Sequence, residues 1–197
     1  MARQLKPKSL QRKTAGDRVA ASGSVLGIDP GLNRTGYAVL RAADQRVLDA
    51  GLIRSSARAS LPVRLREIAA GIDEVLAEFQ PTRVAVEDLY SHYAHPRTAI
   101  LMGHVRGAIF LCAARAGVEV LSLPATRIKK TLTGNGHAGK LQVQRAVQAT
   151  LRLPQLPRPS DVADAIAIAW CAALDGRRTA RWPRPGGPAS GRKVGAT

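Results

Sequence analysis

The chain has 197 residues, 45% of them hydrophobic, which is enough to bury one good core and indicates a single domain. Its formal net charge is +16, from 30 Lys and Arg against 14 Asp and Glu, so we expect a polyanion as partner. A basic surface kept for solubility is the alternative. The longest apolar run, residues 98–114, is too short for a membrane span and contains His104 and Arg106.

Both ends of the chain are basic and lack helical periodicity. Residues 1–24 carry six Lys or Arg and one Asp, and residues 175–197 carry the same numbers. We expect both ends to be flexible arms around one domain of residues 25–174.

The cellular compartment is indicated by two features of the chain. The N-terminal arm has no apolar segment of the kind found in secretory signals. Cys112 and Cys171 lie in apolar helix-like runs, as buried free thiols do in a reducing compartment. We expect a cytoplasmic protein, and an organelle-targeting role for the acid-poor arm is the alternative.

The first half of the domain predicts a meander followed by a helix and a central strand. Three short apolar runs joined by turns predict antiparallel strands over residues 25–29, 36–41 and 47–53. A helical stripe covers residues 61–79. The fully apolar run at 84–86 then predicts a buried strand that ends in Glu87.

The second half alternates between helices and one more strand. The predicted elements are a helix over 97–116, a strand over 118–121, a helix opening at Pro124, a glycine-rich loop at 134–139, a helix over 140–152 and a final helix over 160–170. A meander followed by this alternation predicts a mixed five-stranded α/β sheet flanked by helices.

Four carboxylates fall at the ends of predicted elements. Asp29 ends the first strand at a Pro-Gly turn, and Glu87 ends the central strand. Asp161 and Asp164 lie three residues apart in the first turn of the last helix, so they project from one face. Each one alone fits an ordinary turn residue or an acid favoured by a helix dipole. Together they predict an oxygen-only site for Mg²⁺ or Mn²⁺, because without a cation they would repel and raise one another's pKa.

A carboxylate–metal site in a polyanion-binding protein predicts metal-assisted phosphodiester hydrolysis. One cation would lower the pKa of an attacking water, and a second would stabilise the leaving 3′-oxygen. Lys129 and Lys140 would hold phosphates or offset charge in the transition state. The plainer interpretation of both lysines is a solvated surface.

Four segments carry motifs in a fixed order. They are GIDPG at 27–31 with Thr35-Gly36-Tyr37 after it, VAVED at 84–88, the GxGxAxK pattern at 134–140 and DVADAIAIA at 161–169. In this order and spacing the chain resembles the RuvC family of Holliday-junction resolvases over about residues 25–173.

The resemblance implies a ribonuclease H-like fold and a homodimer that cuts four-way DNA junctions by paired, symmetric nicks. It implies Mg²⁺ or Mn²⁺, two ions per site, and a branch-migration complex of the RuvA and RuvB type as a further partner. By motif, the metal-binding catalytic acids are Asp29, Glu87, Asp161 and Asp164. By the same resemblance, Lys140 is a catalytic and DNA-binding residue. Further DNA contacts are Arg127, Lys129 and Lys130, and the ring of Tyr90 stacks on bases.

Other interpretations remain open at this point. The segment at 134–140 also fits GxxxxGK of a P-loop, although Leu141 stands where Ser or Thr would bind Mg²⁺. A nuclease of the same fold that processes ribosomal RNA, or a junction-binding protein without catalysis, is the functional alternative.

Gly103 and Gly107 lie four apart on one face of the 97–116 helix and allow close approach of a backbone, either in the core or across a dimer.

Overall fold

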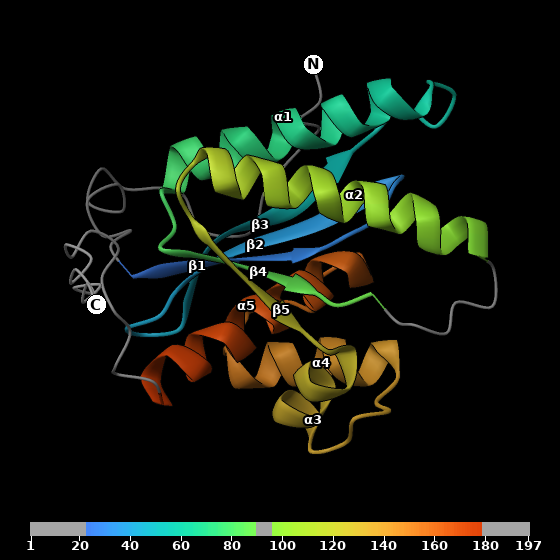
Figure 1. The fold of residues 1–197 in the computed structure, drawn as a ribbon. Helices are drawn as coiled ribbons and strands as arrows, with labels where there is room; N and C mark the ends of the chain where they lie inside the picture. The colour runs from blue at the N-terminus through green and yellow to red at the C-terminus, as the bar shows by residue number, and fades with distance from the viewer. Residues whose placement is uncertain (1–22, 90–95, 179–197) are drawn as a thin grey trace, which may run out of the picture.

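The computed structural model describes residues 23–89 and 96–178, so the two predicted arms lie largely outside it. The described residues form three layers, with a five-stranded sheet between two layers of helices (Figure 1). The strands are β1 (Ser24–Asp29), β2 (Arg34–Arg41), β3 (Arg46–Arg54), β4 (Arg83–Glu87) and β5 (Glu119–Leu123). The helices are α1 (Leu61–Phe79), α2 (Pro96–Arg115), α3 (Ala125–Thr133), α4 (Lys140–Thr150) and α5 (Ser160–Arg178).

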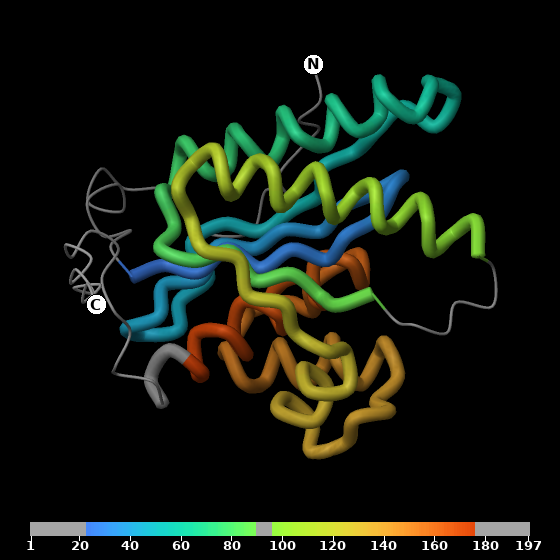
Figure 2. The backbone as a smooth tube through the Cα atoms, in the orientation of Figure 1, coloured from blue at the N-terminus to red at the C-terminus, as the bar shows by residue number. Residues whose placement is uncertain are grey.

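The sheet is mixed, with strand order β3-β2-β1-β4-β5. The first three strands are antiparallel neighbours, and β4 and β5 continue the sheet in parallel with β1. Because β1 and β4 are adjacent and parallel, their C-terminal ends lie at the same edge. The first turn of α5 lies towards that edge as well (Figure 2). The predicted fold class is confirmed.

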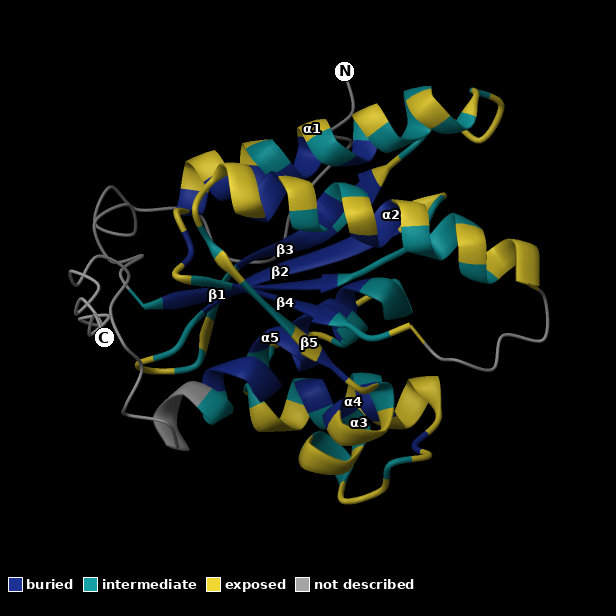
Figure 3. Ribbon diagram, in the orientation of Figure 1, coloured by how far each residue is buried: buried dark blue, intermediate teal, exposed yellow. Residues whose placement is uncertain are grey.

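Each face of the sheet has its own apolar core (Figure 3). On one face, α1 and α2 cover alternate residues of the strands, including Ile28, Tyr37 and Val84. On the other face, α5 packs on the remaining alternate residues, including Ala38 and Leu40. This alternation is the period of two that a strand buried on both sides requires. The helix α5 is itself nearly all apolar along this contact, and α3 and α4 cover it in turn.

The sequence predicts the elements well and their ends less well. The helix over 61–79 has the predicted bounds. The strand β2 begins at Arg34, two residues before the predicted start, because it continues to pair with β3 as far as Arg54. The helix α5 continues beyond residue 170 to Arg178.

Two further expectations can be compared with the described residues. Cys112 and Cys171 are buried free thiols, as predicted. The glycine-rich segment at 134–140 follows the helix α3 instead of a strand, so the P-loop interpretation is wrong. Within residues 23–89 and 96–178, no helix is long and apolar enough to cross a membrane.

Candidate active site

Two glycines on the sheet allow α5 to lie against it without intervening side chains. A Cβ on Gly27 of β1 would stand 2.5 Å from the backbone nitrogen of Ala169, which is closer than real Cβ contacts. A Cβ on Gly36 of β2 would stand 2.7 Å from the carbonyl carbon of Asp161. Gly36 is also the direct neighbour of Asp29 across the β1–β2 pair. The first turn of α5 is therefore placed beside the end of β1.

The turn after Asp29 is short and closed by a threonine. The Thr35 hydroxyl donates to the Gly31 carbonyl oxygen at 2.8 Å and accepts from the Gly31 amide at 3.4 Å. A Cβ on Gly31 would collide with the backbone of Arg34, so the turn needs glycine here. This closure turns the chain back into β2 directly behind the Asp29 carboxylate.

Burial and neighbouring acids make Asp29 a weak acid. Desolvation is the largest cause, and the charges of Asp164, Glu87 and Asp161 follow; together they raise the pKa of Asp29 from its ordinary 3.8 to about 8. Lys140 acts in the opposite direction. The other three predicted acids therefore lie within electrostatic reach of Asp29.

Glu87 and Asp164 share this environment. Burial raises the pKa of Glu87, the charge of Asp164 raises it further, and Lys129 and Arg106 lower it. Burial raises the pKa of Asp164 to about 6, while Lys140 and Lys129 lower it and Asp161 raises it. The acids and both predicted lysines thus form one site. We call its four carboxylates, Asp29, Glu87, Asp161 and Asp164, the acidic cluster.

The side chains of the acidic cluster suit a divalent cation. All donors are carboxylate oxygens, the ligands that Mg²⁺ and Mn²⁺ prefer. The Oδ2 atom of Asp161 is buried and accepts no hydrogen bond among the described residues, although the Arg34 Nε lies 3.2 Å away. As these side chains stand, no three His, Cys, Asp or Glu residues of the described chain converge on one cation position. The Asp161 carboxylate faces Arg34.

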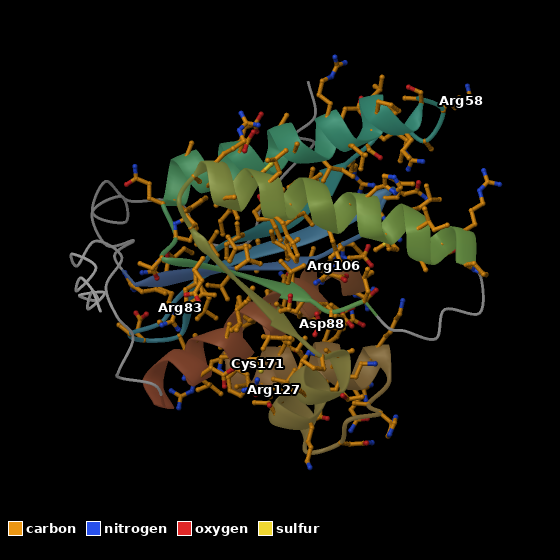
Figure 4. All side chains as sticks on the ribbon, in the orientation of Figure 1. Arg58, Arg83, Asp88, Arg106, Arg127 and Cys171 are labelled. Carbon is orange, nitrogen blue, oxygen red and sulfur yellow. The ribbon has the colours of Figure 1, made fainter. Side chains whose placement is uncertain are left out.

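Arg106 lies beside the site, and the sequence interpretation did not assign it a role. It lies on α2 with only 8% of its surface exposed, and its guanidinium donates to the Glu87 carbonyl oxygen. It also contacts the Asp88 carboxylate at 3.3 Å and the Ser122 hydroxyl at 3.1 Å (Figure 4). A stacking contact with Phe110, 4.9 Å from the ring centroid, completes its surroundings. Arg106 therefore fixes the chain where Glu87 leaves the sheet.

The predicted DNA-contacting residues separate into two groups. Lys129 and Lys140 lie near the acidic cluster. Arg127 and Lys130 instead line a hollow formed by α3 and the glycine-rich loop, and Arg127 forms an ion pair with Asp175 at 2.6 Å. Tyr90 lies outside the described residues, so its predicted stacking role stays a prediction.

Comparison with known proteins identifies relatives both in sequence and in structure. The family model described as crossover junction endodeoxyribonuclease RuvC matches residues 25–172. A protein of that name from Rhodopirellula baltica is 52% identical over 156 residues, which are 78% of this chain and 88% of the relative. One from Alkaliphilus metalliredigens is 38% identical over 154 residues, 77% of this chain and 93% of the relative.

Solved structures agree with these sequence matches. The Thermus thermophilus RuvC structure is 35% identical with a TM-score of 0.72, over 79% of this chain and 96% of that one. The same protein in complex with a Holliday junction substrate matches equally well, at 34% identity and TM-score 0.72, over 79% and 95% of the two chains. The yeast mitochondrial Holliday junction resolvase, at 14% identity and TM-score 0.53 over 79% and 83%, shares the fold. The predicted family is confirmed: the chain belongs to the RuvC family of crossover junction endodeoxyribonucleases.

Proposed function

We propose that this protein resolves four-way DNA junctions by metal-dependent, symmetric hydrolysis of two phosphodiester bonds. The observation that carries the proposal is the acidic cluster, half-buried at one sheet edge with Lys129 and Lys140 beside it, in a chain of net charge +16. The family assignment supports the same activity, since a relative has been solved with a Holliday junction substrate.

The acidic cluster is the proposed metal site. Asp29, Glu87 and Asp164, joined by Asp161 after it leaves Arg34, would hold Mg²⁺ or Mn²⁺. Two bound cations would supply an activated water and charge stabilisation on the leaving oxygen. Burial is the main cause of the raised pKa values of Asp29 and Asp164, and the charges of neighbouring carboxylates add to it. A dication would offset the repulsion between these carboxylates.

The two lysines complete the site from the side of α3 and α4. Lys140 acts electrostatically on Asp29 and Asp164, and Lys129 acts on Glu87 and Asp164. Ammonium groups in these positions would bind the non-bridging oxygens of the scissile phosphate and orient it over the carboxylates. Lys140 is the proposed catalytic lysine because it lies near the first-strand acid.

A homodimer follows from the symmetry of the substrate. Two symmetric nicks in a junction with two-fold symmetry require two sites related by the same axis. The helix α2 offers a face for this contact: nothing in the described chain lies within 4 Å of a Cβ on Gly103 or Gly107. Ile100 and Leu111, on the same helix, are 61% and 58% exposed. The core-packing alternative for the two glycines is therefore wrong within the described chain, and contact with a second copy is the proposal.

The basic arms are proposed to add a sequence-independent contribution to DNA affinity. Residues 1–24 carry a net charge of +5. The predicted C-terminal arm begins at 175, but α5 continues to Arg178, and the residues after it, 179–197, carry four Lys or Arg and no Asp or Glu. Each phosphate contact that they make releases counterions, so affinity depends more steeply on salt. Removal of residues 1–24 is expected to flatten that dependence, and an unchanged slope would show that the arm does not touch DNA.

The double substitution Asp161→Asn with Asp164→Asn tests the site. We expect metal-dependent junction cleavage to be lost while junction binding is retained, since the change removes negative charge and no DNA contact. Surviving cleavage with unchanged binding would show that the acidic cluster is not the active site. Loss of binding and of folding together would indicate that the two acids are structural.

A further inference from the structure

Two arginines lie directly opposite each other at the end of the β2–β3 pair. The register places Arg34, the first residue of β2, across from Arg54, the last residue of β3. Directly opposed residues project from the same face of a sheet. That face is the one covered by α5, because Arg34 reaches Asp161 and because Ile53, the neighbour of Arg54, contacts Gly71 of α1 on the other face.

Among the described residues, little negative charge offsets the two positive charges of Arg34 and Arg54. Opposed like charges destabilise a strand pair. At the far end of the same strands, Arg41 and Arg46 are also opposed, and Asp44 bonds to the guanidinium of Arg41 at 2.7 and 2.9 Å. At the near end, the described residues offer only Asp161, itself a member of the acidic cluster. The side chain of Arg54 is exposed and has no partner in the described parts of the chain.

The backbone that carries both arginines is held firmly. Arg64 of α1 donates to the Ser55 hydroxyl at 3.1 Å and to the Asn33 side-chain oxygen. The Ser55 amide donates to the Asn33 carbonyl at 3.2 Å, and the Ser55 hydroxyl donates to the Leu32 carbonyl. The residues next to Arg34 and Arg54 are thereby tied to one another and to α1. Such fixed placement lowers the entropic cost of binding an anion.

The strand order places this pair and Lys129 on opposite sides of the acidic cluster. Asp29 ends β1 and Glu87 ends β4, in the middle of the sheet. Arg34 and Arg54 lie on the β2–β3 side, whereas Lys129 comes from α3, which follows β5 at the other edge. A nucleic-acid strand that crosses the carboxylates would therefore meet positive charge before and after them.

We infer that Arg34 and Arg54 form a binding site for a backbone phosphate of the junction DNA, next to the scissile phosphate. This inference rests on the proposed function. Arg34 pairs with Asp161 when no cation is bound and turns to the phosphate when a cation takes that carboxylate. Arg54 has no competing partner in the described chain, so it is available to the phosphate whether or not a cation is bound.

The inference is tested by the salt dependence of junction binding. The full chain, with Ca²⁺ to allow binding without turnover, is titrated against a fluorescent four-way junction at several salt concentrations. For Arg34→Gln with Arg54→Gln, we expect the slope of log K against log[salt] to fall by about 1 to 2 and affinity to fall roughly tenfold. The matched control is Arg41→Gln with Arg46→Gln at the far end of the same strands, which should keep the wild-type slope.

Further measurements separate a phosphate contact from a folding defect. The double variant Arg34→Lys with Arg54→Lys keeps the charge, so it should retain most of the wild-type slope. A wild-type slope in the Gln variant, or an equal loss in the far-end control, would overturn the inference. The proposed function is measured separately by wild-type junction cleavage: if the wild type cleaves and the Gln slope is unchanged, only the phosphate site is wrong.

Discussion

Gly36 lies directly against the backbone of Asp161, so the strand next to the first acid and the first turn of the last helix touch without side chains between them. The acids of the cluster come from parts of the chain more than 130 residues apart, from Asp29 to Asp164. Their meeting depends on how closely α5 approaches the sheet. The glycines at 27 and 36 are therefore as necessary to the site as the carboxylates.

The substitution Gly36→Ala tests this dependence. The added Cβ would stand 2.7 Å from the Asp161 carbonyl carbon, and backbone cannot move aside as a flexible side chain can. We expect destabilisation of about 1 to 3 kcal/mol, typical of overpacking, together with loss of most junction cleavage. Thermal denaturation and cleavage rate measure the two effects.

Gly71→Ala is the matched control on the other face of the sheet. There the new Cβ would meet the side chain of Ile53 at 2.7 Å, on the face of the sheet opposite α5. It should destabilise the fold less than Gly36→Ala, because a side chain can shift where backbone cannot, and the folded fraction should keep its cleavage activity. Equal loss of activity per folded molecule in both variants would contradict a special role for Gly36.

The substitution Asp29→Asn should separate cleavage from binding. It removes a carboxylate that would hold the cation, so nicking should be abolished. Junction binding should be spared or tightened, since negative charge beside a phosphate is removed. Gel-shift titration and cleavage of the same junction provide both readouts. Loss of binding together with cleavage would indicate a structural role for Asp29.

The stability of the metal-free protein should fall as pH rises from about 4 to about 8. The pKa of Asp29 is 3.8 ordinarily and about 8 in the folded protein, so the folded state holds this proton more tightly than the unfolded state. Its contribution is fully present below pH 3.8 and is lost as pH rises through the folded pKa of about 8. Asp164, with a folded pKa of about 6, adds to the loss between pH 3.8 and 6.

Calorimetric melting temperatures in chelator, measured across that pH range, test this linkage. The Asp29→Asn variant, which has no proton to lose at this position, should show a shallower fall. Addition of Mg²⁺ should recover stability most at the alkaline end, where the carboxylates are charged. A melting temperature that rises between pH 4 and 8 in the wild type, without metal, would contradict the raised pKa values.

The substitution Gly107→Arg should weaken self-association. Within the described chain nothing lies near a Cβ at this position, so the protomer should fold normally. A large charged side chain on the α2 face would block approach of a second copy. Light scattering should show a shift from dimer to monomer. Ala70→Arg, on the exposed side of α1, is the control expected to leave the dimer intact.

A wild-type monomer with full resolving activity would contradict the proposed dimer. A dimer that survives Gly107→Arg would place the interface elsewhere on the molecule. Cleavage provides a second readout, because a monomer holds one acidic cluster. In the monomeric variant, paired nicks should be replaced by single nicks.

The sequence allowed the family, the sheet and the acidic cluster to be predicted because these depend on short-range patterns. Asp29 and Glu87 end apolar strands, and parallel neighbours end at one edge. The opposed pair of Arg34 and Arg54 was not predictable in the same way, because it depends on the register of β2 against β3. Register is fixed by cross-strand contacts that a single strand pattern does not reveal.

In the helices, the sequence interpretation did not separate neighbouring residues whose side chains point in different directions. Lys129 and Lys130 were expected to act together, but consecutive helical residues point about 100° apart, so one lies near the acids and the other lines a separate hollow. The sequence does contain a feature that marks Arg106. This arginine is the one charged residue among the buried residues of α2, next to Val105 and near Ile109, and a buried charge needs partners.

The central claim is tested most directly by comparing three substrates with and without Mg²⁺ or Mn²⁺. They are a synthetic four-way junction, a linear duplex of the same sequence and an RNA–DNA hybrid. We predict symmetric paired nicks in the junction that require the metal, with little or no cleavage of the other two substrates. Cleavage of the hybrid or duplex at a rate equal to that of the junction, or junction cleavage without metal, would contradict the account.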